Sequence, residues 1–92
     1  MASCVVTLHL YGVHSLKDKR RVVKSLLARL PRRFNVAVAE VNAGDSWSQA
    51  VLGLVTVGRE AAPLHATLEK AVAWIESDHT GAAVERYSIE QL

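Results

Sequence analysis

The residues with the clearest chemical capability are cations gathered in one stretch of the chain. Positions 14 to 33 hold eight of the 11 lysines and arginines and a single acidic residue, Asp18, whereas the remainder holds three basic and eight acidic residues. Ammonium and guanidinium groups crowded in this way repel one another, so the separation of charge favours a polyanionic partner. The alternative interpretation is a solvated helix surface whose charges serve solubility alone.

The spacing of these cations predicts a contact surface for phosphate groups. On a helix at about 100° per residue, four of them fall within about a third of the circumference, opposite the apolar side chains. Cations in the first two helical turns oppose the helix dipole, at a cost of about 0.3–1 kcal/mol each, and a bound anion would relieve that cost. The four are Lys17, Arg20, Arg21 and Lys24. The predicted nucleic-acid-binding set also includes, at its margins, Lys19, Arg32 and Arg33.

Such a surface suits the phosphate backbone better than the base edges. A helix that reads the major groove of DNA needs side chains aimed at bases, and this surface offers cations only. Phosphate contacts draw their affinity largely from counterion release, which does not separate RNA from DNA. A protein with an acidic face is the other partner that would fit.

Four further side chains could extend this surface. His14 precedes the basic stretch, where it would either contact a phosphate or make a hydrogen bond that orders the loop; we favour the hydrogen bond. Trp47 lies in an expected loop, and packing against the core or an interface is favoured over stacking on a ligand. His9 and Tyr11 could stack on a base, but a structural role at an interface or sheet edge is favoured.

No pattern in the chain indicates catalysis, a metal site or a cofactor. The four histidines lack metal-ligand spacing, and Cys4 alternates with core residues as an inert buried thiol would. For Glu40 and Asp45, which flank an expected turn, hydrogen bonds to turn amides are favoured over a magnesium site. We therefore expect no catalytic residue, no metal ligand and no cofactor.

Hydrophobic periodicity predicts the elements that position these residues. Alternating apolar residues indicate strands at 4–10, 34–41, 49–57 and 83–89. Ser15 is a suitable N-cap for a first helix, with Asp18 three residues later as in a capping box, and Pro31 is expected to end that helix. Pro63 fits the first turn of a second helix. The expected apolar stripes are Leu16, Val22, Val23, Leu26, Leu27 and Leu30 in the first helix and Leu64, Leu68, Ala71, Val72 and Ile75 in the second.

This order of elements predicts the fold class. Strand, helix, strand, strand, helix, strand with right-handed crossovers is typical of the α+β, ferredoxin-like βαββαβ sandwich. Its four-stranded antiparallel sheet carries two helices on one face. We expect residues 1–92 to form a single domain of this kind.

The open face of the expected sheet predicts self-association. A sheet covered on one side normally alternates apolar and polar residues, yet the strand at 49–57 is apolar on both faces apart from Thr56. We expect a homodimer through this face, with a merely apolar surface as the alternative. The same strand carries no aromatic residue, so this face is a poor platform for stacking bases.

Composition places further limits on the protein. Half of the 92 residues are hydrophobic, which excludes an intrinsically disordered chain. No apolar run is long enough to span a bilayer, the first residues do not resemble a signal peptide, and one cysteine cannot form an internal disulfide. We expect a cytoplasmic protein with no membrane partner.

Three segments in this order resemble the YlxP-like family of small bacterial proteins, a domain of unknown function. They are His14 to Leu26, Phe34 to Val41, and Asp45-Ser46-Trp47 followed by Ala50-Val51-Leu52-Gly53. The resemblance implies a ferredoxin-like fold and no established enzymatic activity. Members are often encoded near translation-initiation and ribosome-maturation factors, which favours a role with RNA or the ribosome. Related chains tend to carry a basic residue near position 49, where this chain has Gln49.

Three hypotheses about function follow. The favoured one is a non-catalytic binding module that contacts structured RNA or a ribosomal particle through its basic first helix. The second is a structural or regulatory homo-oligomer with a protein partner and no role with nucleic acid. The third is a small acyl phosphate hydrolase, a class that shares the expected topology; it is disfavoured because residues 12–15 lack the loop arginine that those enzymes use.

Overall fold

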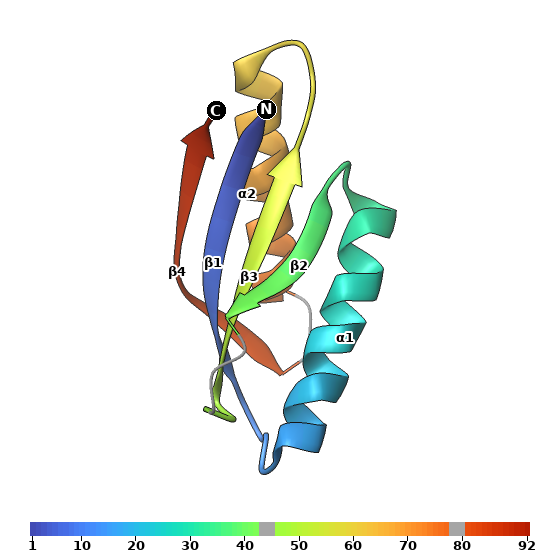
Figure 1. Cartoon of the computed structure of the whole chain (residues 1–92), viewed down its shortest axis with the longest axis vertical. Coiled ribbons are helices and arrows are strands. Elements are labelled where there is room, and N and C mark those ends of the chain that lie inside the picture. Colours follow the sequence, from blue (N-terminus) through green and yellow to red (C-terminus); the bar gives the residue numbers. More distant parts are fainter. Residues whose placement is uncertain (43–45, 78–80) are drawn as a thin grey trace.

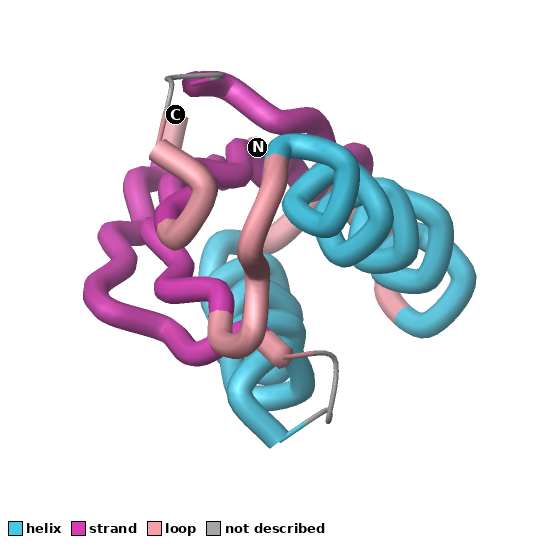
Figure 2. Tube along the Cα trace, turned by 90° about the horizontal axis from the view of Figure 1, so that it is seen from below, coloured by secondary structure: helices cyan, strands magenta, loops and turns pink. Residues whose placement is uncertain are grey.

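The computed structural model describes residues 1–42, 46–77 and 81–92. Along the chain the elements are β1 (Ala2–Leu10), α1 (Leu16–Arg33), β2 (Ala37–Asn42), β3 (Gln49–Thr56), α2 (Ala61–Ser77) and β4 (Ala82–Gln91). The strands form one antiparallel sheet in the order β2-β3-β1-β4. Both helices lie on the same side of this sheet (Figures 1 and 2). This is the predicted ferredoxin-like arrangement, and the other face of the sheet is open.

The core lies between the sheet and the two helices. Alternation in β1 places Cys4, Val6 and Leu8 in it, all nearly fully buried. The five residues predicted as the stripe of α2 are all buried. In α1 the buried residues are Lys19, Val23, Leu26 and Leu30, whereas Leu16, expected in the stripe, is 43% exposed. The prediction for Leu16 is therefore wrong, because Lys19 is the residue of the first turn of α1 that faces inward.

Two predicted boundaries are also wrong. Helix α1 does not end at Pro31 but continues to Arg33, with Pro31 in its last turn. Proline removes one backbone donor, and so close to a helix end few further bonds depend on it; the amide of Phe34 still donates to the carbonyl of Leu30 (3.0 Å). Strand β2 begins at Ala37 rather than Phe34, because Phe34 is the C-cap of α1. The other strands differ from prediction by two residues or fewer at each end.

A bulge shapes the edge of the sheet near β2. The register between β2 and β3 shifts between Glu40 and Asn42, which leaves Val41 outside the regular pairing. The side chain of Val41 then lies over Gly53, where an added Cβ would meet Val41 Cγ1 at 2.8 Å. A side chain at position 53 would displace Val41, so the glycine permits this close approach.

Candidate functional site

Four cations on α1 form the surface that we call the cationic face: Lys17, Arg20, Arg21 and Lys24. All four are exposed. Within residues 1–42, 46–77 and 81–92, none of the four side chains makes a hydrogen bond, an ion pair or a contact with an aromatic ring. The predicted cluster therefore exists as an exposed surface, and no carboxylate of the described chain neutralises it.

The start of α1 holds this face in place. Ser15 is the N-cap, and its Oγ accepts a hydrogen bond from the amide of Asp18 (3.1 Å). The Asp18 carboxylate in turn accepts from the backbone amide of His14 (3.2 Å). Because Val23 and Leu26 are buried on the opposite side of the helix, the helical repeat directs the four cations outward.

Lys19 does not belong to the exposed surface, contrary to our placement of it at the margin. Its side chain is 7% exposed, and its Nζ donates to the carbonyl oxygen of Ser46 (2.9 Å) and lies 3.9 Å from Glu40 Oε2. The physical reason is its position in the helical repeat. Residues 19, 23, 26 and 30 are spaced as one helix stripe, and that spacing was the signal by which the sequence could have placed Lys19 inward.

Glu40 is the carboxylate that faces this lysine. Its Oε2 atom is buried and has no hydrogen-bond partner in the described part of the chain, since the 3.9 Å to Lys19 Nζ exceeds hydrogen-bonding distance. The ion pair is therefore electrostatic rather than hydrogen-bonded. We predicted hydrogen bonds to turn amides for both Glu40 and Asp45. The part of this prediction that concerns Asp45 lies outside the described residues.

Arg32 and Arg33 lie at the far end of α1 from the cationic face. At 1.5 Å per residue they are about 12–14 Å along the helix from Lys24 and about 22–24 Å from Lys17, so they stand apart from the cluster. Both are exposed, and the Arg33 guanidinium lies 5.2 Å from the ring centroid of Trp74. Arg29 lies over the same ring at 5.1 Å, and Phe34 meets it edge-on at 6.2 Å. Trp74 therefore has a packing role.

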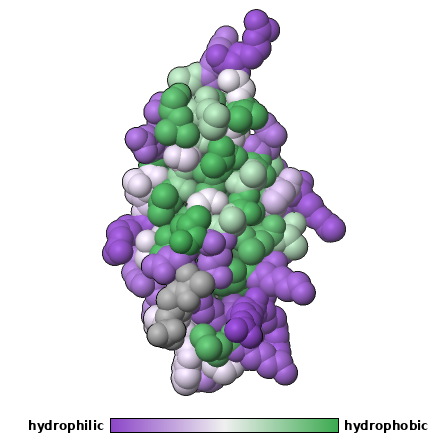
Figure 3. All heavy atoms as spheres, viewed as in Figure 1, coloured by the Kyte–Doolittle hydropathy of each residue, from purple (hydrophilic) through white to green (hydrophobic). Residues whose placement is uncertain are grey.

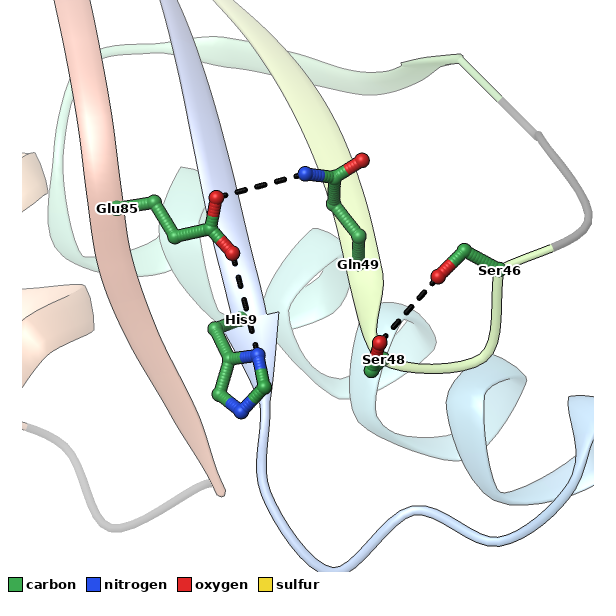
Figure 4. A network of polar contacts seen from close by, with 5 residues as sticks. All are labelled: His9, Ser46, Ser48, Gln49 and Glu85. Carbon is green, nitrogen blue, oxygen red and sulfur yellow. Dashed lines mark hydrogen bonds and ion pairs between the residues drawn. The ribbon is translucent and has the colours of Figure 1, made fainter.

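Trp47 is not packed in the core. We favoured a tryptophan packed against the core or an interface; at 50% exposure it is outside the core, and packing at an interface stays a prediction. It stands between Ser46 and Ser48, whose hydroxyl oxygens are 3.3 Å apart (Figure 4). The reason is local. Ser46 is bound to Lys19, and the carbonyl of Ser48 accepts from the amide of Leu10 (2.7 Å), so the segment follows the sheet end rather than folding over the core.

A polar group on the open sheet face was not predicted from the sequence. Glu85 of β4 lies 3.9 Å from His9 Nδ1 and accepts a hydrogen bond from Gln49 Nε2 (3.4 Å), so three strands meet through one carboxylate (Figure 4). His9 also meets Tyr11 edge-on at 4.9 Å. The register shift between β1 and β4 next to Thr7 and Leu8 places Glu85 here, and only the pairing of the strands reveals such a shift.

The chemistry open to the remaining groups is limited. Among the described residues no three His, Cys, Asp or Glu side chains gather as metal ligands; His79 lies outside them. Burial raises the pKa of the Cys4 thiol to about 11, and the nearby Glu69 charge adds to the effect. A thiol with that pKa is protonated at neutral pH and is a poor nucleophile. No helix in the described part of the chain is long and apolar enough to cross a membrane.

Comparison with known proteins places the chain in a family. The family described as "Protein of unknown function (DUF503)" matches residues 1–89. The chain belongs to the DUF503 family. The chain is also similar to the uncharacterised protein YlxP of Bacillus subtilis (strain 168), at 32% identity over 68 residues, which cover 74% of each chain. The resemblance to YlxP-like proteins is thus confirmed, and neither description names an activity.

Proposed function

We propose that this DUF503 protein is a non-catalytic module that binds structured RNA, free or within a ribosomal particle, through the cationic face of α1. The observation that carries the proposal is the exposure of Lys17, Arg20, Arg21 and Lys24 without an anionic partner in the described chain. A cytoplasmic location goes with this proposal, because that is where ribosomal RNA is found in bacteria.

The position of the cations on the helix supports a bound anion. Lys17 lies in the first turn of α1 and Arg20 and Arg21 lie in the second, near the end where the aligned peptide dipoles create positive potential. An exposed cation in the first turn costs about 0.3–1 kcal/mol, an effect that falls off along the helix, and phosphate groups would reverse the sign of that interaction. A helix selected for stability alone would carry acids in this turn, and Asp18 is the single one.

The side-chain types support recognition of shape rather than of sequence. Lysine and arginine contact phosphate oxygens readily, and the cationic face offers no amide side chain for pairing with base edges. Helical RNA is recognised largely through its backbone and groove geometry. A DNA backbone offers the same phosphate contacts, and the resemblance to YlxP-like proteins, which are often encoded near ribosome-maturation factors, is what favours structured RNA as the polyanion.

Salt dependence tests this proposal directly. If about four phosphates are neutralised, log K against log salt should fall with a slope of roughly −3 to −4. Lys17→Glu combined with Arg21→Glu should weaken binding by about tenfold or more and reduce the size of the slope by about 2. Fluorescence anisotropy of a labelled hairpin RNA at several salt concentrations measures both quantities.

A matched control keeps the change in net charge constant. Arg59 and Lys70 are also exposed, and they lie before and within α2, away from the cationic face. Arg59→Glu combined with Lys70→Glu should leave the slope close to that of the unchanged protein. Absence of binding at low salt, or equal losses in the two double variants, would contradict the proposal.

A second candidate function is self-association through the open sheet face. Val5, Val41, Val55 and Val57 are exposed large hydrophobic residues. Val5 lies opposite Gly53, the side chain of Val41 lies over the same glycine, and Val55 lies opposite both Ser3 and Ala37. Hydrophobic side chains gather over the strands on this face (Figure 3). A contiguous apolar patch of this kind is typical of an interface.

The occupant that we propose for this face is a second copy of the chain. Strand β4 places Arg86 opposite Thr7 and Glu90 opposite Ser3, so both signs of charge flank the valines on the same face. Two copies related by a two-fold axis can pair the Arg86 of one with the Glu90 of the other, as self-complementary interfaces do. The cationic face lies on the helix side of the sheet, so this dimer leaves it accessible.

A further inference from the structure

Trp47 is an exposed aromatic side chain on a segment that the fold holds in place. The residues before and after it both accept a hydrogen bond at their backbone carbonyl. The carbonyl of Ser46 accepts from Lys19 Nζ (2.9 Å), and that of Ser48 accepts from the amide of Leu10 (2.7 Å). The indole itself is half exposed and makes no ring contact among the described residues. A backbone that is hydrogen-bonded before and after Trp47 thus presents an aromatic ring to solvent.

The other tryptophan shows what packing would look like in this protein. Trp74 is partly buried against the core and has Arg29, Arg33 and Phe34 around its ring. Trp47 has none of these neighbours. An indole left in water forgoes the free energy of burial that aromatic side chains usually gain, so its exposed ring is available to a ligand.

The hydrogen bond from Lys19 to the Ser46 carbonyl also connects the Trp47 segment to α1, the helix that carries the cationic face. The carbonyl that Lys19 binds belongs to the peptide bond between Ser46 and Trp47, so Trp47 lies within the reach of one side chain from the first turns of α1. Arg20 follows Lys19 directly on that helix and is exposed. The starts of α1 and β3 lie at the same end of the molecule (Figure 1).

We infer that Trp47 stacks on an unpaired base of the RNA whose phosphates contact the cationic face. This inference rests on the proposed function and names the kind of RNA. A ligand that combines a flat π surface with dense negative charge matches an exposed indole on a segment bonded to α1 together with the free cations of that helix, and nucleic acid has both. The base must be unpaired, because bases inside a duplex have both faces covered by their neighbours.

Three binding measurements test the inference. The probes are a single-stranded RNA oligonucleotide, the same strand annealed to its complement, and a hairpin with an open loop. Trp47→Ala should weaken binding of the single strand and the hairpin by about 5- to 150-fold, the range expected for one stacked base, and leave duplex binding unchanged. Trp47→Phe should retain most of the affinity, because a smaller ring still stacks.

The salt slope separates this inference from the proposed function. Stacking releases no counterions, so Trp47→Ala should lower affinity at every salt concentration without changing the slope, whereas reversal of Lys17 and Arg21 changes the slope. Equal binding of the single strand by Trp47→Ala and the unchanged protein would overturn the inference and leave the proposed function standing. Absence of binding to all three probes at low salt would overturn both.

Fluorescence gives an independent readout. In the Trp74→Phe variant Trp47 is the only tryptophan, and its emission should be quenched by the single strand but not by the duplex. A change in that emission with protein concentration, in the absence of RNA, would place Trp47 in an interface between copies and overturn the inference. Should Trp74→Phe fail to fold, the affinities of Trp47→Ala decide the question.

Discussion

Cys4 is a thiol that the fold keeps protonated. Its side chain is almost fully buried in β1, and burial together with the Glu69 charge raises its pKa from 9.0 to about 11. Glu69 also acts on Tyr87. The Tyr87 hydroxyl donates a hydrogen bond to the Glu69 carboxylate (2.8 Å), and this hydrogen bond raises the pKa of Tyr87. Both groups therefore hold their protons more tightly in the folded protein than in the unfolded chain.

Stability should fall as pH rises from about 9 to about 11. Below this window Cys4 is protonated in both states; within it the unfolded chain releases the thiol proton that the native protein retains. The free energy of unfolding then falls by up to about 1.4 kcal/mol per pH unit for this one group. Urea unfolding at a series of pH values should show a shallower fall for Cys4→Ala. An unchanged pH dependence in that variant would contradict the assignment.

Lys19 shows what one buried cation does in a small protein. A buried ammonium group loses hydration worth several kcal/mol, so it needs partners, and here the Ser46 carbonyl and Glu40 are among them. The same contacts connect α1 to the segment before β3. Lys19 is thus a positioning residue for Trp47 rather than a member of the cationic face.

At the scale of the element, α1 depends on its N-terminal cap. The hydrogen bond from the Asp18 amide to Ser15 Oγ satisfies one of the free donors of the first turn. Ser15→Ala should lower the free energy of unfolding by about 1 kcal/mol, and Ser15→Asp should restore most of it because aspartate caps equally well. Urea unfolding followed by circular dichroism measures both.

Ser25 provides the matched control for this prediction. It lies in the interior of α1, where alanine has the higher helix propensity, so Ser25→Ala should be neutral or slightly stabilising. If Ser15→Ala and Ser25→Ala behave alike, the cap does not stabilise α1. The cap also matters for function, because the first turn that it orders carries Lys17 and leads into the rest of the cationic face.

At the scale of the whole molecule, the open sheet face is the surface through which we expect a stable dimer. A standard interface needs about 800 Å² from each partner, and the whole molecule, sheet and α1 together, measures 42 by 22 Å in the view of Figure 1. Sedimentation equilibrium at micromolar concentrations should therefore detect a dimer. Val5→Glu combined with Val55→Glu should give a monomer, because buried unpaired carboxylates oppose association.

Leu16→Glu is the control for the dimer. Leu16 is also an exposed large hydrophobic residue, but it lies on α1 rather than on the open face. This variant should remain dimeric. A protein that sediments as a monomer at these concentrations without any substitution would contradict self-association through the sheet. RNA binding does not depend on the dimer, because the cationic face lies on the helix-covered side of the sheet and the dimer uses the open face.

The sequence by itself determined the features that depend on local periodicity. Alternation in β1 identified Cys4, Val6 and Leu8 as core residues, and the spacing of Leu64, Leu68 and Ile75 identified the buried side of α2. The order of the elements was sufficient for the fold class, and the helical repeat of α1 was sufficient to cluster Lys17, Arg20, Arg21 and Lys24. These features follow from the repeat of each element alone, 2 residues in a strand and about 3.6 in a helix.

Only the tertiary structure decided the features that depend on what packs against what. Lys19 is buried because Ser46 and Glu40 face it from the segments around β2 and β3, and Trp47 is exposed because its segment is bound to Lys19 and β1 instead of the core. Glu85 meets His9 through a register shift that pairing creates. Such contacts join residues far apart in the chain, so no repeat within one segment encodes them.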